Sequence, residues 1–410
     1  MSPRDDLLAI YTAALNAVEG QQVVKKSLID LDYLQICPQG CHLIAVGKAA
    51  ESMSLGAIKQ LSNAIKSGLI ITKHGHFTTV LTSDKRFKCV ESSHPIPDLS
   101  SLQAGEQLLH YLQQLPEQAH CLVLISGGAS SLVEVLQPDW TLAELQALTH
   151  YLLANSYPIE EINAVRRHVS QIKAGGLWNY LQNKQVTCLM ISDVADNDPA
   201  IIGSGLLFPS SSAIPSSLPS KWCSRFKVAP VIVTPVVKVP LFKWDIIATL
   251  DDAKQSAALA AVKLGYRVNI DPVFLRGDAV EMAKQCVRQL QQSTADMMIW
   301  GGETTVNLPD NAPIGGRNQH FALAVAIELA TYGGSFLCIG TDGSDGSSDA
   351  AGALVDAQTL QQGIAYELSA QEYLQHANAH AFLTATGSLV ATGVTNTNVM
   401  DLVIGIKKNN

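Results

Sequence analysis

Short apolar runs that alternate with longer amphipathic stretches constrain the fold of this chain more than any other feature. In the first half the runs are residues 41–46, 69–72, 121–125 and 186–191, with helical patterns over 49–61, 102–115 and 142–155 between them. The runs lack polar residues at every second position, which is typical of strands covered on both faces. The second half repeats the rhythm, with predicted strands at 245–249, 267–270, 297–300, 336–339 and 402–406. This alternation predicts an α/β fold with largely parallel sheets flanked by helices.

The length of 410 residues corresponds to two or three compact units at roughly 100–200 residues each. The periodic pattern is interrupted over residues 209–240, which are rich in serine and proline. We place a domain boundary there and expect domains at 1–235 and 236–410. A single long surface loop is the alternative interpretation.

Composition excludes several classes of protein. Apolar residues make up 47% of the chain and charged residues 16%, which is incompatible with a disordered chain. The net charge of −8 argues against a nucleic-acid partner. No apolar run approaches the roughly 18 residues of a membrane span, so no membrane association is expected. The first residues carry acid where a secretory signal needs positive charge, and no CxxC pair occurs. We therefore expect a cytoplasmic protein with reduced cysteines.

Polar residues directly after apolar strands mark the candidate site, because ligands of open parallel sheets bind outside the carboxyl ends of the strands. Gly47 and Lys48 follow the first run, and Lys48 opens a helix, where a cation is unfavourable unless an anionic ligand binds. The third run is followed by a loop whose glycines and serines suit phosphate oxygens: Ser126, Gly127, Gly128, Ala129 and Ser130. An ordinary solvated lysine and a plain capped turn are the competing interpretations.

Acidic loops supply the other half of the expected chemistry. Asp193 follows a buried run and is a candidate for a general base or a magnesium ligand. Gly301, Gly302 and Glu303 form a second glycine loop, and Gly316 precedes Arg317, whose forked guanidinium suits a carboxylate or phosphate. Thr341, Asp342 and Asp345 lie in a further acidic loop that suggests a metal–phosphate site. Together these cations, carboxylates and glycine turns suit phosphoryl transfer to a small anionic alcohol. For each of these loops, a structural turn that binds no ligand is the alternative interpretation.

Ordered motifs then reveal a family resemblance. They run from Val46-Gly-Lys-Ala-Ala50, His94-Pro-Ile-Pro-Asp98, Ser126-Gly-Gly-Ala-Ser130, Asn163-Ala-Val-Arg-Arg-His168, Lys173-Ala-Gly-Gly176 and Ser192-Asp193 to Gly301-Gly-Glu-Thr304, Gly315-Gly-Arg-Asn-Gln319, Thr341-Asp-Gly343, Asp349-Ala-Ala-Gly352, Thr395-Asn-Thr-Asn-Val399 and Asp401. Over nearly its whole length the chain resembles the type-2 glycerate kinases, which have a glycerate-kinase domain followed by a MOFRL domain. The resemblance implies phosphorylation of D-glycerate by ATP with Mg²⁺, usually at the 2-hydroxyl, in a cleft between two α/β domains.

The resemblance also implies roles for single residues. Lys48, Asp193 and Arg317 become the expected catalytic residues, with Lys48 stabilising the transferred group, Asp193 acting as base or metal-side carboxylate, and Arg317 anchoring a carboxylate or the γ-phosphate. Substrate and nucleotide contacts are expected at Gly47, Ser126, Gly127, Gly128, Ala129, Ser130, Gly301, Gly302, Glu303, Gly316, Asn318, Gln319, Thr341 and Asn398. Metal ligands are expected among Asp193, Asp342 and Asp345.

Some motifs depart from the family pattern. The loop after Asp193 reads Ala195-Asp-Asn-Asp-Pro199 where the family carries Gly-Asp-Asp-Pro, and His320 replaces the glutamate that commonly follows Asn-Gln. These changes bear on substrate preference, because the three expected catalytic residues are in place. Two other functions remain open: a hydroxypyruvate reductase using NAD(P)H, which the absence of GxGxxG after a strand disfavours, and a non-catalytic glycerate or phosphosugar sensor. The chain is expected to be a monomer or a homodimer.

Overall fold

The chain forms two compact units that do not follow a simple division of the sequence. The computed structural model describes residues 2–155, 157–210, 213–226, 242–309 and 311–408. The first unit, here called the parallel-sheet unit, is Gly20–Ile247. The second, the mixed-sheet unit, combines Met1–Glu19 with Ala248–Asn410. The boundary predicted between residues 235 and 236 lies outside the described residues.

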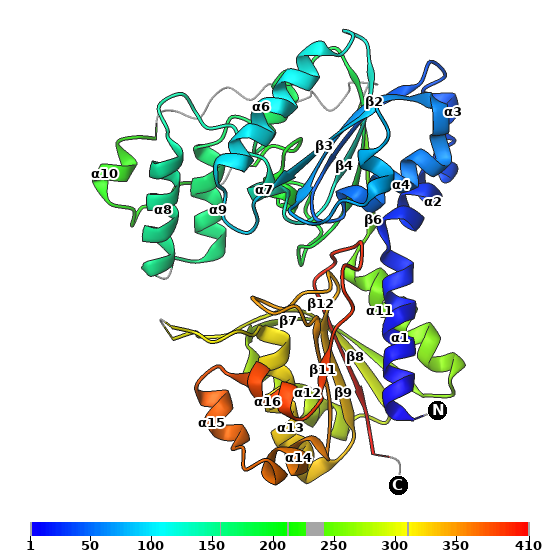
Figure 1. Cartoon of the computed structure of the whole chain (residues 1–410), viewed down its shortest axis with the longest axis vertical. Coiled ribbons are helices and arrows are strands. Elements are labelled where there is room, and N and C mark those ends of the chain that lie inside the picture. Colours follow the sequence, from blue (N-terminus) through cyan, green and yellow to red (C-terminus); the bar gives the residue numbers. More distant parts are fainter. Residues whose placement is uncertain (1, 156, 211–212, 227–241, 310, 409–410) are drawn as a thin grey trace. The chain divides into compact units, whose positions relative to one another are not determined.

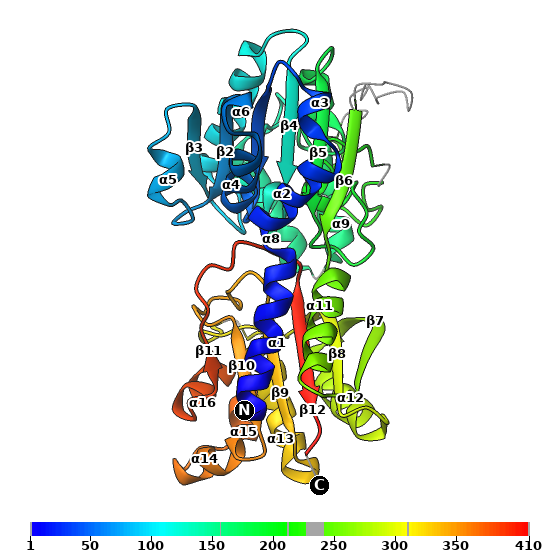
Figure 2. The ribbon, with the colours of Figure 1, turned by 90° about the vertical axis from the view of Figure 1, so that its right-hand side faces the viewer.

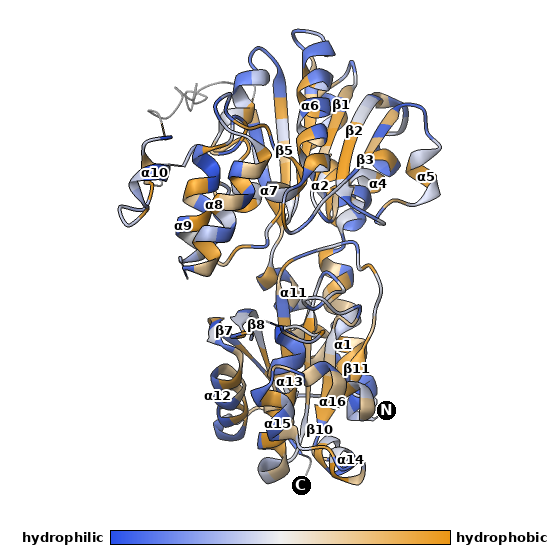
Figure 3. Ribbon diagram, turned by 60° about the vertical axis from the view of Figure 1, so that its left-hand side comes forward, coloured by the Kyte–Doolittle hydropathy of each residue, from blue (hydrophilic) through white to orange (hydrophobic). Residues whose placement is uncertain are grey.

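The parallel-sheet unit is built on six strands in the order β3-β2-β1-β4-β5-β6. Their bounds are β1 Cys41–Val46, β2 Ile65–Lys73, β3 Phe87–Ser92, β4 His120–Ile125, β5 Gln185–Ile191 and β6 Phe242–Ala248. The four pairings among β1 to β5 are all parallel, as predicted. The strands β1 and β2 are mainly hydrophobic (Figure 3), because the sheet is covered on its faces by helices.

Helices of this unit follow the strands in alternation (Figure 2). They are α2 Gly20–Asp30, α3 Tyr33–Ile36, α4 Ala50–Leu61, α5 Thr79–Thr82, α6 Leu99–Gln114, α7 Ala129–Leu132, α8 Leu142–Ala154, α9 Ile159–His168 and α10 Ser220–Cys223, with 3₁₀ turns at Ser62–Ala64, Gly176–Tyr180 and Ile202–Ser204. The long helix α6 packs Leu108 and Leu112 into the same core as Ile44 and Val123 of the central strands. Asp98 begins α6 with a capping box that it shares with Ser101.

The mixed-sheet unit has six strands in the order β11-β10-β9-β12-β8-β7. Their bounds are β7 Val268–Asp278, β8 Met297–Thr305, β9 Ser335–Gly340, β10 Gly352–Asp356, β11 Leu389–Val390 and β12 Asp401–Ile406. Only β7 and β8 are parallel; the other four neighbouring pairs of described strands are antiparallel. This corrects the expectation of a mostly parallel second sheet. The 11 residues between β9 and β10 form no crossover helix, so β10 returns beside β9 in the opposite direction.

Seven helices within the described residues flank this second sheet. They are α1 Pro3–Val18, α11 Leu250–Lys263, α12 Ala279–Gln292, α13 Arg317–Tyr332, α14 Thr359–Ala365, α15 Ala370–Gln375 and α16 Ala379–Ala385. Trp300 of β8 and Phe336 of β9 stack with ring centroids 5.8 Å apart, and Phe321 of α13 lies in the same core. The predicted α/β character with helical layers is therefore confirmed for both units.

The first helix belongs to the mixed-sheet unit although it begins the chain. Helix α1 runs alongside α11 (Figure 1), and it also contacts β9. The hydroxyl of Tyr11 donates to the carbonyl oxygen of Gly340 at 2.8 Å, and Thr397 Oγ1 donates to the carbonyl oxygen of Val18 at 2.6 Å. The sequence pattern of α1 predicts a helix but not the sheet on which it packs. Among the described residues, no helix is long and apolar enough to cross a membrane.

Candidate active site

The ends of β1 and β4 bring two predicted loops together in the parallel-sheet unit. Val46 lies opposite Ile125 in the parallel ladder, so the residues that follow both strands meet at the same edge. The backbone N–H of Lys48 donates to the carbonyl oxygen of Gly127 at 2.9 Å. The next N–H, of Ala49, donates to Ser126 Oγ at 3.0 Å. The two loops are therefore one connected structure rather than two separate turns.

Glycine is required at two positions of this junction. Gly47 has φ +138°, and a Cβ there would lie 2.1 Å from Ser126 Oγ. Gly128 has φ +85°, and a Cβ there would lie 3.2 Å from Lys48 Cγ and 3.0 Å from His94 Cδ2. Cγ of Lys48 consequently lies close to the bare backbone of Gly128. His94 was quoted in the motif but was not predicted as a site residue.

Asp193 lies at the same edge of the sheet, beyond the end of β5. Strand β5 pairs with β4 in parallel, with Met190 opposite Ile125. Ser192 accepts the backbone N–H of Val194 on its hydroxyl at 3.4 Å, which holds the turn that carries Asp193. The Asp193 side chain is partly buried. The structure thus places Lys48, the Ser126–Ser130 loop and Asp193 at the carboxyl ends of neighbouring strands, as predicted from their positions after apolar runs.

In the mixed-sheet unit, Arg317 pairs with the carboxylates of Asp401 and Glu303. It is the first residue of α13, and its Nε donates to Asp401 Oδ2 at 2.5 Å while Nη2 donates to Oδ1 at 3.1 Å. Nη1 lies 2.7 Å from Glu303 Oε1. Burial by itself would lower the pKa of Arg317, but the carboxylates of Asp401 and Glu303 raise it. Asp401 was quoted only as part of a motif, and the structure makes it the main partner of Arg317.

Asp345 is a helix cap, which argues against its predicted role as a metal ligand. Oδ1 accepts the backbone N–H of Asn318 at 3.0 Å, and Oδ2 accepts that of Gln319 at 2.9 Å. The side-chain amide of Gln319 also donates to Oδ2 at 3.0 Å. A Cβ on Gly316 would lie 2.2 Å from Asp345 Cγ. Asn318, Gln319 and Gly316 therefore serve the start of α13, and both Asp345 oxygens are already acceptors.

Four other predicted contacts are also used within the fold. Gly301 and Gly302 lie inside β8 rather than in a loop, and a Cβ on Gly301 would lie 2.7 Å from Leu250 Cδ1. Thr341 Oγ1 donates to the carbonyl oxygen of Met400 at 2.6 Å and accepts the N–H of Val399 at 2.8 Å. Asn398 accepts the N–H of Met400 at 3.3 Å. These residues shape the backbone near Asp401.

Asp342 remains beside Asp401. A Cβ built on Gly340 would lie 3.5 Å from Asp342 Oδ1 and 3.5 Å from Asp401 Oδ1. Both carboxylates also act on Tyr11, whose pKa is raised by burial and then by the charges of Asp342 and Asp401. Asp342 Oδ1 accepts the N–H of Ser344 at 3.1 Å. Asp342, Asp401 and Glu303 outnumber the single charge of Arg317, so this cluster suits a cation.

No resident metal centre is built from these carboxylates. In the described ranges, no three side chains of His, Cys, Asp and Glu are grouped closely enough to hold a metal ion. Magnesium that arrives on a nucleotide needs only one or two carboxylates besides phosphates and water. The oxygen donors near Gly340 fit that mode of binding.

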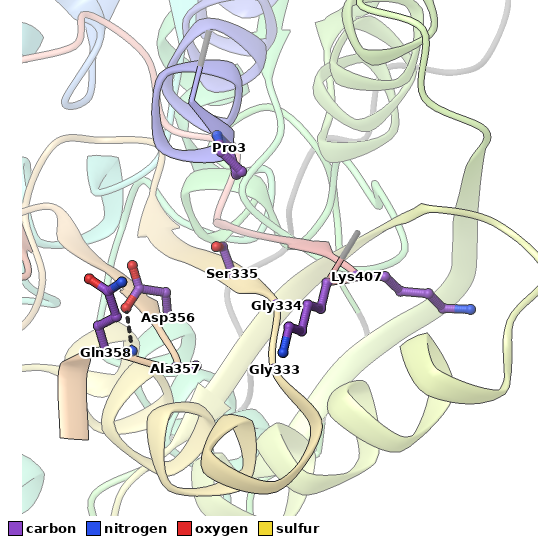
Figure 4. Close-up of a pocket in the computed structure, with 9 residues that line it drawn as sticks. Pro3, Gly333, Gly334, Ser335, Asp356, Ala357, Gln358 and Lys407 are labelled. Atoms are coloured by element: carbon purple, nitrogen blue, oxygen red, sulfur yellow. Dashed lines mark hydrogen bonds between the residues drawn. The ribbon is translucent and has the colours of Figure 1, made fainter. Parts of the chain in front are cut away.

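A separate pocket of about 260 Å³ lies at the other end of the mixed sheet. It is lined by Pro3, Gly333, Gly334, Ser335, Asp356, Ala357, Gln358, Lys407 and Lys408 (Figure 4). Ser335 begins β9, whereas Gly340 ends it, so this pocket is distant from the Arg317 cluster along the strand. The carboxylate of Asp356 accepts the N–H of Gln358 at 2.8 Å. None of the predicted site residues lines this pocket.

Comparison with known proteins identifies the family. A family model described as a domain of unknown function, DUF4147, matches residues 6–229, and the model of the MOFRL family matches residues 296–401. The chain is 33% identical over 417 residues to a D-glycerate 2-kinase of Thermotoga maritima, covering 97% of each chain. The chain belongs to the glycerate 2-kinase family.

A solved structure and a further relative are also similar to this chain. The crystal structure of a glycerate kinase from Thermotoga maritima superposes on this family member with a TM-score of 0.82 and 31% identity, over 98% of this chain and 99% of that one. A relative from Agrobacterium vitis, 30% identical over 98% of this chain and 94% of its own, carries the provisional name hydroxypyruvate reductase. Most of the first helix of this glycerate 2-kinase family member, from residue 6 on, lies in the DUF4147 match, although the helix packs in the mixed-sheet unit.

Proposed function

We propose that this chain phosphorylates D-glycerate with ATP and releases 2-phospho-D-glycerate and ADP. The observation that carries the proposal is the junction of Lys48 with the Ser126–Ser130 loop, in a chain that matches a D-glycerate 2-kinase along its length. A lysine beside a glycine-rich turn suits phosphoryl oxygens.

The proposed step moves one proton and one phosphoryl group. Asp193 accepts the proton of the glycerate hydroxyl, whose oxygen attacks the γ-phosphorus as the bond to the ADP oxygen breaks. Lys48 stabilises the negative charge that spreads over the phosphoryl oxygens. Both residues follow strands of one parallel sheet, so the sheet determines their spacing.

The mixed-sheet unit is proposed to bind the phosphates of the nucleotide. Arg317 has five N–H groups, three of which are directed at Asp401 and Glu303, and the remaining edge can contact a terminal phosphate. Asp342 is proposed to face the Mg²⁺ that accompanies ATP, where the ion neutralises phosphate charge. In this proposal Arg317 also positions Asp401.

A coupled assay of ADP release with D-glycerate and Mg²⁺-ATP tests the activity. Phosphorus NMR of the product, against authentic 2- and 3-phosphoglycerate, identifies the hydroxyl that reacts. Steady oxidation of NADH by hydroxypyruvate, with no ADP released from glycerate, would replace the kinase by the reductase. Thermal stabilisation by glycerate without turnover would instead indicate a sensor.

The cellular setting is also part of the proposal. We place the enzyme in the cytoplasm, where ATP is abundant. The structure describes all eight cysteines as free thiols, and a reducing compartment would keep them so. The proposed partners are small molecules, D-glycerate and ATP.

A further inference from the structure

The parallel-sheet unit contains a fully buried ion pair, one partner of which follows the Ser126–Ser130 loop in the chain. Lys173 Nζ contacts Glu134 Oε2, and both side chains are 0% exposed. The other carboxylate oxygen, Oε1, accepts the backbone N–H of Val135 at 3.0 Å. Burial lowers the pKa of Lys173 to about 8 against the opposing effect of Glu134. The carboxylate of Glu134 is therefore already committed to one cation.

Arg166 brings a second cation to the same carboxylate. It lies in the last turn of α9, and Glu134 is the charge that opposes the effect of burial on its pKa. Nη2 of Arg166 donates to the carbonyl oxygen of Ser130 at 3.3 Å. Its Nε is buried and has no hydrogen-bond partner among the described residues. The fully buried Lys173 and the partly buried Arg166 thus both feel the charge of one carboxylate.

This surplus positive charge destabilises the folded protein unless an anion balances it. A buried charge is tolerated when it is paired and its hydrogen-bonding groups are satisfied. The planar fork of arginine matches the two oxygens of a carboxylate. A carboxylate ligand would balance the cluster and use donors that the fold leaves without partners.

The position of Arg166 connects this cluster with the proposed phosphoryl site. Arg166 holds Ser130 at one end of the loop, and Lys48 holds Gly127 at the other. Ser204 Oγ donates to Ser130 Oγ at 2.7 Å, and the N–H of Ala174, next to Lys173, donates to the Ser204 carbonyl at 3.0 Å. The loop is therefore fixed from both sides, with one cation at each end.

We infer that Arg166 binds the carboxylate of the hydroxy acid whose hydroxyl is phosphorylated near Lys48, and that Lys173 and Glu134 position Arg166. This inference rests on the proposed kinase function and adds the residue that selects an acid over an uncharged alcohol. Arg166 touches the substrate in this account, whereas Lys173 and Glu134 act through it.

The test compares D-glycerate with its uncharged amide, D-glyceramide, in the wild type and in Arg166→Gln. The wild type should prefer the acid in kcat/KM, because only the acid pairs with the guanidinium. Arg166→Gln should lower kcat/KM for glycerate by about 30- to 1000-fold, the range for losing one partner of a buried charge pair. The rate with glyceramide and the KM for ATP should change less than about threefold. Guanidinium ion in solution should partly restore the KM for glycerate in Arg166→Ala.

Two comparisons keep the test specific. Arg86→Gln removes an arginine before β3, at the amino-terminal edge of the same sheet, and should leave the preference for acid over amide unchanged. Glu134→Gln should raise the KM for glycerate more than it lowers kcat, since it disturbs only the position of Arg166. Should Arg166→Gln fail to fold, Arg166→Lys keeps the buried charge and should still lose most of the preference, because lysine lacks the fork.

The outcomes separate this inference from the proposed function. A wild type that releases no ADP from glycerate overturns the kinase and the inference together. An active wild type whose preference for the acid survives in both Arg166 variants overturns the inference alone. A rise in the KM for ATP in place of the KM for glycerate would assign Arg166 to phosphate and also overturn it.

Discussion

Arg317 and Asp401 form a two-bond ion pair in which Nε lies 2.5 Å from Oδ2 and Nη2 lies 3.1 Å from Oδ1. Arg317 begins α13, whereas Asp401 begins β12, 84 residues later in the chain. The pair therefore joins the start of a helix to the start of a central strand. A single substitution at Asp401 should disturb both the fold and the proposed nucleotide site.

Asp401→Asn should lower the free energy of unfolding by about 2–3 kcal/mol, because it leaves the partly buried guanidinium of Arg317 without its main charge partner. It should also lower kcat/KM by about 100-fold or more, since Arg317 would no longer be held. Asp296→Asn breaks the exposed pair with Arg267 and should cost less than about 1 kcal/mol. Urea unfolding and steady-state kinetics measure both. Equal costs for the two variants would contradict a special role for the Arg317 pair.

Lys48→Ala should lower kcat/KM by about two orders of magnitude or more without unfolding the protein, because the lysine is proposed to act on the transition state. Lys59→Ala, on the exposed face of the last turn of α4, is the matched control and should keep normal kinetics. Circular dichroism would confirm the fold of each. Near-normal turnover in Lys48→Ala would remove this lysine from the site.

Gly47→Ala should destabilise the protein more than Gly75→Ala. Both glycines have positive φ, at +138° and +76°, so both substitutions strain the backbone by about 1 kcal/mol or more. Only Gly47 would in addition drive a Cβ against Ser126, because no atom lies within 4 Å of a Cβ on Gly75. The extra cost should exceed about 1 kcal/mol in urea unfolding, together with a loss of activity. If the two variants lost equal stability, the Gly47–Ser126 junction would not be as tight as described.

Asp345 should make the stability of the protein depend on pH between about pH 4 and pH 6. Burial raises the pKa of Asp345 to about 6, from an ordinary value of 3.8. Between these values the folded protein holds a proton that the unfolded chain has lost, so this contribution to stability decreases as the pH rises through 6. The difference in unfolding free energy between wild type and Asp345→Asn should be about 1 kcal/mol larger at pH 5 than at pH 7. Urea titrations at the two pH values measure it; a difference that grew with pH would contradict the raised pKa.

Much of the parallel-sheet unit was predictable because its strands are continuous apolar runs. The runs at 41–46, 69–72, 121–125 and 186–191 correspond to β1, β2, β4 and β5. Strand β3 was missed because it lies at the sheet edge and mixes exposed charged residues with buried ones. The loops after these strands were predicted as site residues for the same reason: the carboxyl ends of parallel strands share one edge.

The sequence by itself determined the α/β character, the family motifs and the residues that follow each buried strand. Those properties depend on local hydrophobic periodicity and on the spacing of residues within short motifs, both of which lie in short stretches of the sequence. Tertiary structure alone decided that α1 packs in the mixed-sheet unit, that Asp345 caps α13, and that Asp401 holds Arg317. It also decided that Lys173 pairs with Glu134 and that Arg166 contacts Ser130. These relationships join residues that are distant in the chain, and they depend on which charged groups are buried together, so no local pattern encodes them.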